Sequence, residues 1–92
     1  MEDAALARRW ELTGRILEID LPRQLSLRSW RLLRFNMKDR GNDVLVIIEV
    51  QVPEQLDQVA FCTGKDLASA VRTAYSLLVQ DKLRWRDKKR WD

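Results

Sequence analysis

The feature that most constrains the fold is a run of alternating apolar residues between positions 43 and 52. Every second residue in this run is β-branched, and these residues are Val44, Val46, Ile48, Val50 and Val52. Because successive side chains of a strand point to opposite sides, this spacing predicts a strand with one buried face. Pro53 cannot donate a hydrogen bond to a sheet ladder, so it should end the strand.

A second strand is predicted immediately upstream, at residues 29–37, with a polar turn at residues 39–42. Folding the two strands about this turn places apolar residues opposite one another on one face. The expected pairs are Met37 with Val44, Phe35 with Val46, and Leu33 with Ile48. A shift of the register by one residue would destroy this match, so the pattern predicts an antiparallel hairpin.

Three further segments have weaker patterns. Residues 13–21 alternate and are followed by Pro22, which predicts a third strand and then a loop at residues 23–28. Residues 3–12 fit a short helix. Residues 54–62 fit either a helix or an edge strand, and we favour the strand.

The C-terminal third of the chain is predicted to be helical. Thr63 is the expected N-cap, with Asp66 in the first turn. Apolar residues then recur at helical spacing, at Leu67, Val71, Ala74, Leu78 and Trp85. The expected fold is therefore α+β: a three- or four-stranded antiparallel β-meander packed against one long C-terminal helix.

Composition limits the function. A chain of 92 residues, 46% hydrophobic and 34% charged, should form a single domain over residues 1–92, with residues 83–92 as a basic C-terminal tail. It has no histidine and one cysteine, so it lacks the commonest general base and the ligands of a zinc site. We therefore expect no catalytic residues, no metal site and no cofactor. No apolar run is long enough to cross a membrane, so we expect a cytoplasmic protein without membrane contact.

Basic residues are concentrated in two clusters, although the net charge is only +3. One cluster lies within residues 23–40 and the other within residues 82–92, and each contains tryptophan. Cations neutralise phosphates and indole rings stack on bases, so both clusters favour binding to DNA or RNA by a non-catalytic regulatory protein. The residues predicted to bind nucleic acid are Arg28, Trp30, Arg34, Lys38, Arg84, Arg86, Lys88, Lys89, Arg90 and Trp91.

The same surface of the predicted sheet carries apolar residues, which supports a second hypothesis. In the expected register the large apolar side chains that point away from the core are Ile16, Trp30, Leu32, Leu45 and Ile47. Exposed apolar patches usually mark an interface. The alternative function is therefore a protein–protein interaction module, such as an adaptor, inhibitor or assembly factor, that docks through the outer sheet face. The expected oligomer is a homodimer.

Two partial resemblances point in a similar direction. The segment from Glu49 to Leu78 is similar to ribbon-helix-helix DNA binders in its strand, Pro53-Glu54, Ala60-x-x-Thr63-Gly64 and the run from Ala70 to Ala74. The resemblance implies that the strand presents Ile47, Glu49 and Gln51 to a DNA groove. The predicted meander followed by one helix also resembles HicB-type antitoxin domains in fold order. Both resemblances imply a small regulator that contacts nucleic acid or a toxin, and neither assigns the chain to a family.

Overall fold

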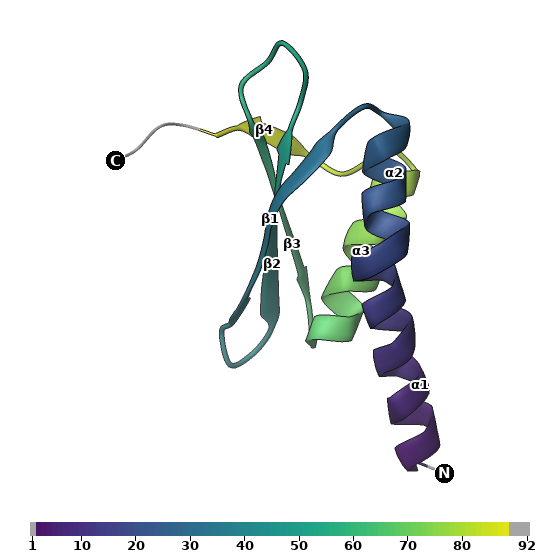
Figure 1. Ribbon diagram of the computed structural model, residues 1–92. Coiled ribbons are helices and arrows are strands. Elements are labelled where there is room, and N and C mark those ends of the chain that lie inside the picture. The colour runs from purple at the N-terminus through teal and green to yellow at the C-terminus, as the bar shows by residue number, and fades with distance from the viewer. Residues whose placement is uncertain (1, 89–92) are drawn as a thin grey trace.

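The computed structural model describes residues 2–88 (Figure 1). The chain begins with an N-terminal arm made of α1 (Glu2–Arg15), a π-helical turn η1 (Ile16–Asp20) and α2 (Leu21–Leu27). Three strands follow, β1 (Arg31–Asp39), β2 (Val44–Gln51) and β3 (Gln58–Gly64). The chain then forms α3 (Leu67–Val79) and the short strand β4 (Trp85–Asp87). In this part of the chain no helix combines the length and the apolar character needed to cross a membrane.

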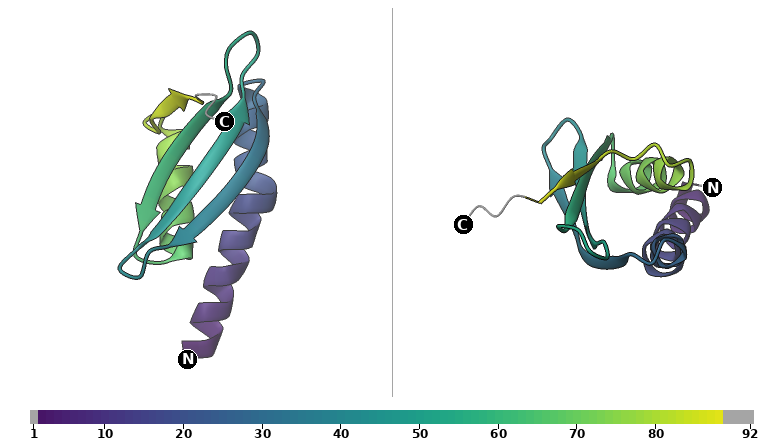
Figure 2. Two further views of the ribbon diagram at one scale, coloured as in Figure 1. Left: turned by 90° about the vertical axis from the view of Figure 1, so that its left-hand side faces the viewer. Right: turned by 90° about the horizontal axis from the view of Figure 1, so that it is seen from above.

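The strands form one antiparallel sheet in the order β1-β2-β3-β4. Figures 1 and 2 show the helices on one side of this sheet only. This arrangement confirms the predicted α+β class and the antiparallel meander. The helical layer differs from the prediction, because α3 has only 13 residues and packs beside the N-terminal arm.

The N-terminal arm is helical where the sequence predicted a strand ending before Pro22 and a loop after it. Leu21 and Leu25 lie one helical turn apart and are 1% and 0% exposed, with Leu17 packed against the same core. This spacing outweighs the alternation of Leu17, Ile19 and Leu21, and it leaves Ile19 exposed. Pro22 does not break the arm, because it lies in the first turn of α2, directly after the π-helical turn.

The β1–β2 hairpin is present, but its register is shifted by two residues from the prediction. Met37 pairs with Val46, and Phe35 pairs with Ile48. A shift of two preserves the face that each residue occupies, because the side chains alternate with a period of two. The β-branched face of β2 is therefore buried as predicted.

An irregularity at Leu33 changes the first half of β1. The pairing with β2 skips Leu33 between Leu32 and Arg34. An extra residue of this kind reverses the side to which the residues before it point. Leu32 and Trp30 therefore pack against the core instead of facing outward, and Leu33, predicted to be inside, is 42% exposed.

The segment at residues 54–62 contains the strand that we favoured. β3 begins at Gln58 and pairs antiparallel with β2. Its inward residues Ala60 and Cys62 are 1% and 8% exposed, and burial raises the pKa of the Cys62 thiol, which disfavours the reactive thiolate. Ribbon-helix-helix proteins need a helix after the strand at this place, so the structure does not support that resemblance.

The helix α3 starts later and ends earlier than predicted. Its N-cap is Asp66, which accepts a hydrogen bond from the Ser69 N–H at 2.8 Å, while the predicted cap Thr63 lies in β3. The helix ends at Val79, so Trp85 lies in β4 and not in the helical stripe. The earlier part of the stripe is buried against the sheet as expected.

The core lies between the inner face of the sheet and the helices. Ala70 and Ala74 of α3 are 0% and 2% exposed, and these small side chains let the helix approach the sheet closely. Trp30 and Trp85 pack against this core, and their rings meet edge to face with centroids 5.4 Å apart and planes at 89°. Because Trp30 precedes β1 and Trp85 begins β4, the pair joins the two edges of the sheet beneath its inner face.

Candidate nucleic-acid interface

One face of the sheet carries no helix from residues 2–88, as Figure 2 shows. We call it the outer face and define it by the strand residues that point away from the helices. These residues are Arg31, Arg34, Asn36, Lys38, Leu45, Ile47, Glu49, Gln51, Val59, Phe61, Thr63 and Arg86. They alternate with the core residues, so the register that buries the valines also determines the outer face.

Basic side chains stand along both edges of the outer face. Arg31, Arg34 and Lys38 project from β1, and all are exposed. Arg86 is exposed on β4, at the opposite edge of the sheet. The outward positions of β1 and β4 contain no acidic residue, so each edge of the outer face is positively charged.

An apolar strip lies between these edges, on the two central strands. Leu45 and Ile47 project from β2, and Val59 and Phe61 project from β3. Ile47 and Phe61 are direct cross-strand partners. Phe61 is 48% exposed, so much of its ring is accessible to a ligand.

A shallow groove of about 660 Å³ lies over the β3–β4 side of the outer face. Its lining is apolar on one side and charged on the other, and consists of Ile47, Val59, Phe61, Glu49, Arg86, Asp87 and Lys88. We call this set of residues the groove. Its volume falls within the range of pockets that bind small organic ligands.

The charged side of the groove is held by specific polar contacts. Glu49 is only 9% exposed, and its Oε2 lies 2.9 Å from the Nζ of Lys88. The backbone N–H of Lys88 donates to the carbonyl oxygen of Asp57 at 2.7 Å. The Nε2 of Gln58 donates to Oδ1 of Asp87, also at 2.7 Å. These contacts fasten β4 and the residue after it to the sheet, and so shape the groove.

Nine of the ten predicted nucleic-acid-binding residues fall into three groups. Arg34, Lys38 and Arg86 lie on the outer face, Lys88 lines the groove, and Arg84 is exposed directly before β4. Trp30 is buried in part against the core, where it contacts Trp85, so it cannot stack on a base at the outer face. Lys89, Arg90 and Trp91 lie outside the described residues.

The predicted apolar interface is smaller than expected. Leu45 and Ile47 lie on the outer face. Ile16, Trp30 and Leu32 instead pack against the core. Ile16 does so because its segment is helical, and the other two because of the irregularity in β1.

Arg28, which was also predicted to contact phosphate, serves to join two helices. Its guanidinium donates to the carbonyl oxygen of Leu78 at 2.9 Å and to Oδ1 of Asp81 at 2.6 Å. It also donates to the carbonyl oxygen of Gln24 at 2.9 Å. These bonds connect the end of α2 to the end of α3, so Arg28 does not belong to the outer face.

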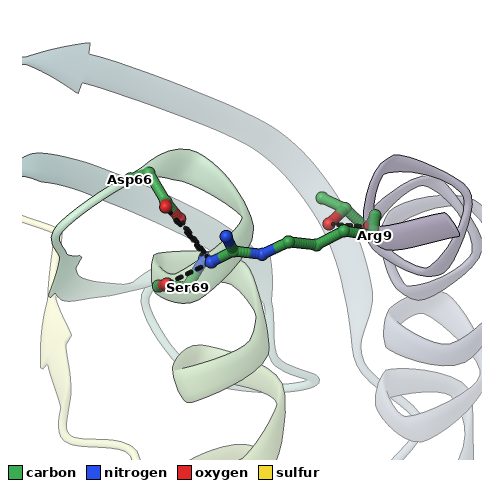
Figure 3. Close-up of polar contacts among 4 residues, drawn as sticks. Arg9, Asp66 and Ser69 are labelled. Atoms are coloured by element: carbon green, nitrogen blue, oxygen red, sulfur yellow. Dashed lines mark hydrogen bonds and ion pairs between the residues drawn. The ribbon is translucent and has the colours of Figure 1, made fainter. Parts of the chain in front are cut away.

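A second polar cluster lies on the helical side of the molecule (Figure 3). The Nη2 atom of Arg9 is 3.1 Å from each carboxylate oxygen of Asp66 and 2.8 Å from the Oγ of Ser69. The backbone and side-chain hydrogen bonds from Ser69, followed by the positive charge of Arg9, hold the pKa of Asp66 below its ordinary value. The charges in this cluster satisfy one another, so we interpret it as a contact that holds α1 against the start of α3.

Sequence reasoning missed the part of the outer face that β3 contributes. Val59 and Phe61 lie in the segment at residues 54–62, for which the sequence allowed either a helix or a strand. Arg31 was assigned to no site. The signal that was present is the alternation of Val59, Phe61 and Thr63 with the smaller or polar residues between them. Protein-family models, curated proteins and solved structures provide no match to this chain.

Proposed function

We propose that this protein binds single-stranded nucleic acid across its outer face, in a non-catalytic regulatory role. The proposal rests on one observation: exposed cations at both edges of the sheet flank an apolar strip with an accessible phenyl ring. Cations bind phosphates, and aromatic rings bind the faces of bases. We further propose that it works in the cytoplasm, where a free thiol such as that of Cys62 stays reduced.

The spacing of the cations on β1 supports an extended polyanion as the ligand. Residues four apart on one face of a strand are about 13 Å apart, which is the expected separation of Arg34 and Lys38 along β1. A nucleic-acid strand that runs beside β1 brings phosphates to both residues. Its bases then turn inward over Ile47 and Phe61, and Arg86 offers a further cation at the far edge.

The chemistry of the strip favours a single strand over a duplex. In a duplex the base faces are hidden within the stack, and proteins reach only the base edges and the backbone. In a single strand the bases can unstack, so their faces become available to an aromatic side chain. Phe61 can therefore contribute to binding only when the bases are unpaired or splayed apart.

Replacing Phe61 with alanine should weaken binding to a short single strand by roughly five- to a hundredfold, because stacking contributes about 1–3 kcal/mol per base. Fluorescence anisotropy at low salt measures the change. Leu12→Ala is the matched control, because Leu12 is also 48% exposed but lies on α1, away from the outer face. The control should bind as the unmodified protein does. Equal affinities of the two variants would remove base stacking from the proposal.

The apolar strip favours a second candidate function, a protein–protein interaction module that includes a homodimer packed sheet on sheet. The supporting observation is the contiguous set Leu45, Ile47, Val59 and Phe61 on the outer face. Arg34→Gln separates the two candidates. It removes one phosphate contact, which lowers the salt dependence of nucleic-acid binding, but a dimer held by apolar area keeps its dissociation constant. Light scattering over a range of protein concentrations reports the dimer, and a strict monomer would exclude it.

A further inference from the structure

We propose that the groove binds a guanine base, and that Glu49 distinguishes guanine from the other bases. This inference rests on the proposed binding of single-stranded nucleic acid and names the base that the same site prefers. It follows from the place of one carboxylate, the groove around it and the hydrogen-bonding chemistry of nucleobases.

Glu49 carries a negative charge, which is unfavourable on a surface that binds phosphate. It is the only acidic residue among the outward positions of the four described strands, and its cross-strand neighbours on the sheet are Arg34 and Val59. A carboxylate at the centre of this surface repels phosphate, so it weakens any ligand that makes only backbone contacts. Its side chain is 11% exposed and lines the groove, where a base edge can reach it.

A carboxylate selects among base edges because it can only accept hydrogen bonds. Guanine presents two adjacent donors, the ring N–H and the exocyclic amino group, on its Watson–Crick edge. Adenine and cytosine each present an amino group beside a ring nitrogen that accepts, and uracil presents one N–H between two carbonyl groups. Guanine is therefore the base whose edge matches both oxygens of Glu49, and unpaired bases expose this edge.

The rest of the groove fits the remainder of a guanine nucleotide. Phe61, Val59 and Ile47 supply an apolar and aromatic wall for the face of the base. Arg86 and Lys88 stand on its charged side, where they can bind the flanking phosphates. The Lys88 ammonium group has three donors and its side chain is 41% exposed, so it can bind a phosphate while it stays paired with Glu49.

The test measures the affinity of the unmodified protein for oligouridine strands that differ at one central base. A strand with guanine should bind roughly ten- to a hundredfold more tightly than strands with adenine or uracil, as expected of a bidentate contact. Inosine, which lacks the exocyclic amino group, should lose most of this advantage. The guanine strand is measured as both RNA and DNA, and we expect the preference in both because Glu49 reads the base.

Glu49→Gln tests the residue itself. Its amide turns a donor towards guanine and matches the amino group and ring nitrogen of adenine, so the preference for guanine over adenine should be lost or reversed. The all-uridine strand should bind as well as before or better. Glu18→Gln is the control, because Glu18 is exposed in η1, away from the groove, and it should keep the preference. Thermal unfolding checks that both variants are folded. If Glu49→Gln does not fold, the comparison of guanine with inosine on the unmodified protein tests the guanine assignment.

The outcomes distinguish this inference from the proposed function. Equal binding of all strands by the unmodified protein, or a guanine preference that survives in folded Glu49→Gln, would overturn the guanine assignment and leave nucleic-acid binding intact. A lack of binding to every strand at low salt would overturn both. If Glu49→Gln unfolds at a lower temperature but keeps the guanine preference, the guanine assignment is overturned. Glu49 then serves to hold Lys88 and β4 in place.

Discussion

Replacing Leu25 with alanine should destabilise the protein by about 2–5 kcal/mol. Leu25 is 0% exposed and belongs to the cluster of core residues beneath the sheet. The truncation removes apolar contacts and leaves a cavity that the surrounding side chains cannot fully close. Urea unfolding followed by circular dichroism measures the change in the free energy of unfolding.

Leu27 provides the matched control, because it has the same side chain on the same helix and is 73% exposed. Leu27→Ala should change the free energy of unfolding by no more than about 0.5 kcal/mol. Equal effects of the two variants would mean that the N-terminal arm does not pack on the sheet as the structure describes.

Replacing Gly64 with alanine should also destabilise the fold, by about 1–3 kcal/mol or more. A Cβ at this position would lie 2.4 Å from the backbone nitrogen of Ala70 and 2.7 Å from its Cα atom. Backbone atoms cannot rotate away as a flexible side chain can, so α3 must shift relative to β3. Thermal unfolding should record a fall in Tm of roughly 4–8 °C for each kcal/mol lost.

Gly14→Ala is the corresponding control. Gly14 lies in α1, and an added Cβ there would meet no atom within 4 Å apart from the neighbouring backbone of its own helix. Alanine in place of a helical glycine should raise stability by about 0.5–1 kcal/mol, because it reduces the conformational freedom of the unfolded chain. If Gly64→Ala were as stable as Gly14→Ala, this result would contradict the close approach of β3 to α3 at Gly64.

The sheet was the part of the fold that the sequence determined best. β2 has a β-branched residue at every second position, so only one face of the strand can be turned to the core. The structure buries this face. The register with β1 was wrong by two residues because the turn was placed one residue too early: it was expected at residues 39–42, whereas Asp39 belongs to β1 and pairs with Val44. The error did not change the faces of Phe35 and Met37, since side chains alternate with a period of two.

The N-terminal arm was the part that the sequence determined least. Leu17, Ile19 and Leu21 alternate as in a strand, but Leu17, Leu21 and Leu25 are also spaced as in a helix. Pro22 suggested an end to the strand, whereas in the structure it lies at the start of α2. Only the tertiary packing of Leu21 and Leu25 decides between the two patterns, and sequence periodicity alone does not contain it.

The candidate site depends on a detail of one strand that no local pattern predicted. The irregularity at Leu33 turns Trp30 and Leu32 towards the core, which removes the aromatic residue that sequence reasoning assigned to base stacking. In the structure Phe61 is the exposed aromatic residue of the outer face, and it lies on β3, where the sequence allowed either a helix or a strand. The basic residues Arg34 and Lys38 remained outside because they follow the irregularity, where the alternation is regular again.

The most direct test of nucleic-acid binding at the outer face is the salt dependence of the affinity for a short, fluorescently labelled single strand. The cations expected to contact phosphate across the sheet are Arg31, Arg34, Lys38 and Arg86. Each contact to a single strand contributes about 0.7 to the slope, so the logarithm of the association constant should fall against the logarithm of the salt concentration with a slope of about −3. An affinity that does not change with salt, or a lack of binding even at low salt, would contradict the proposal.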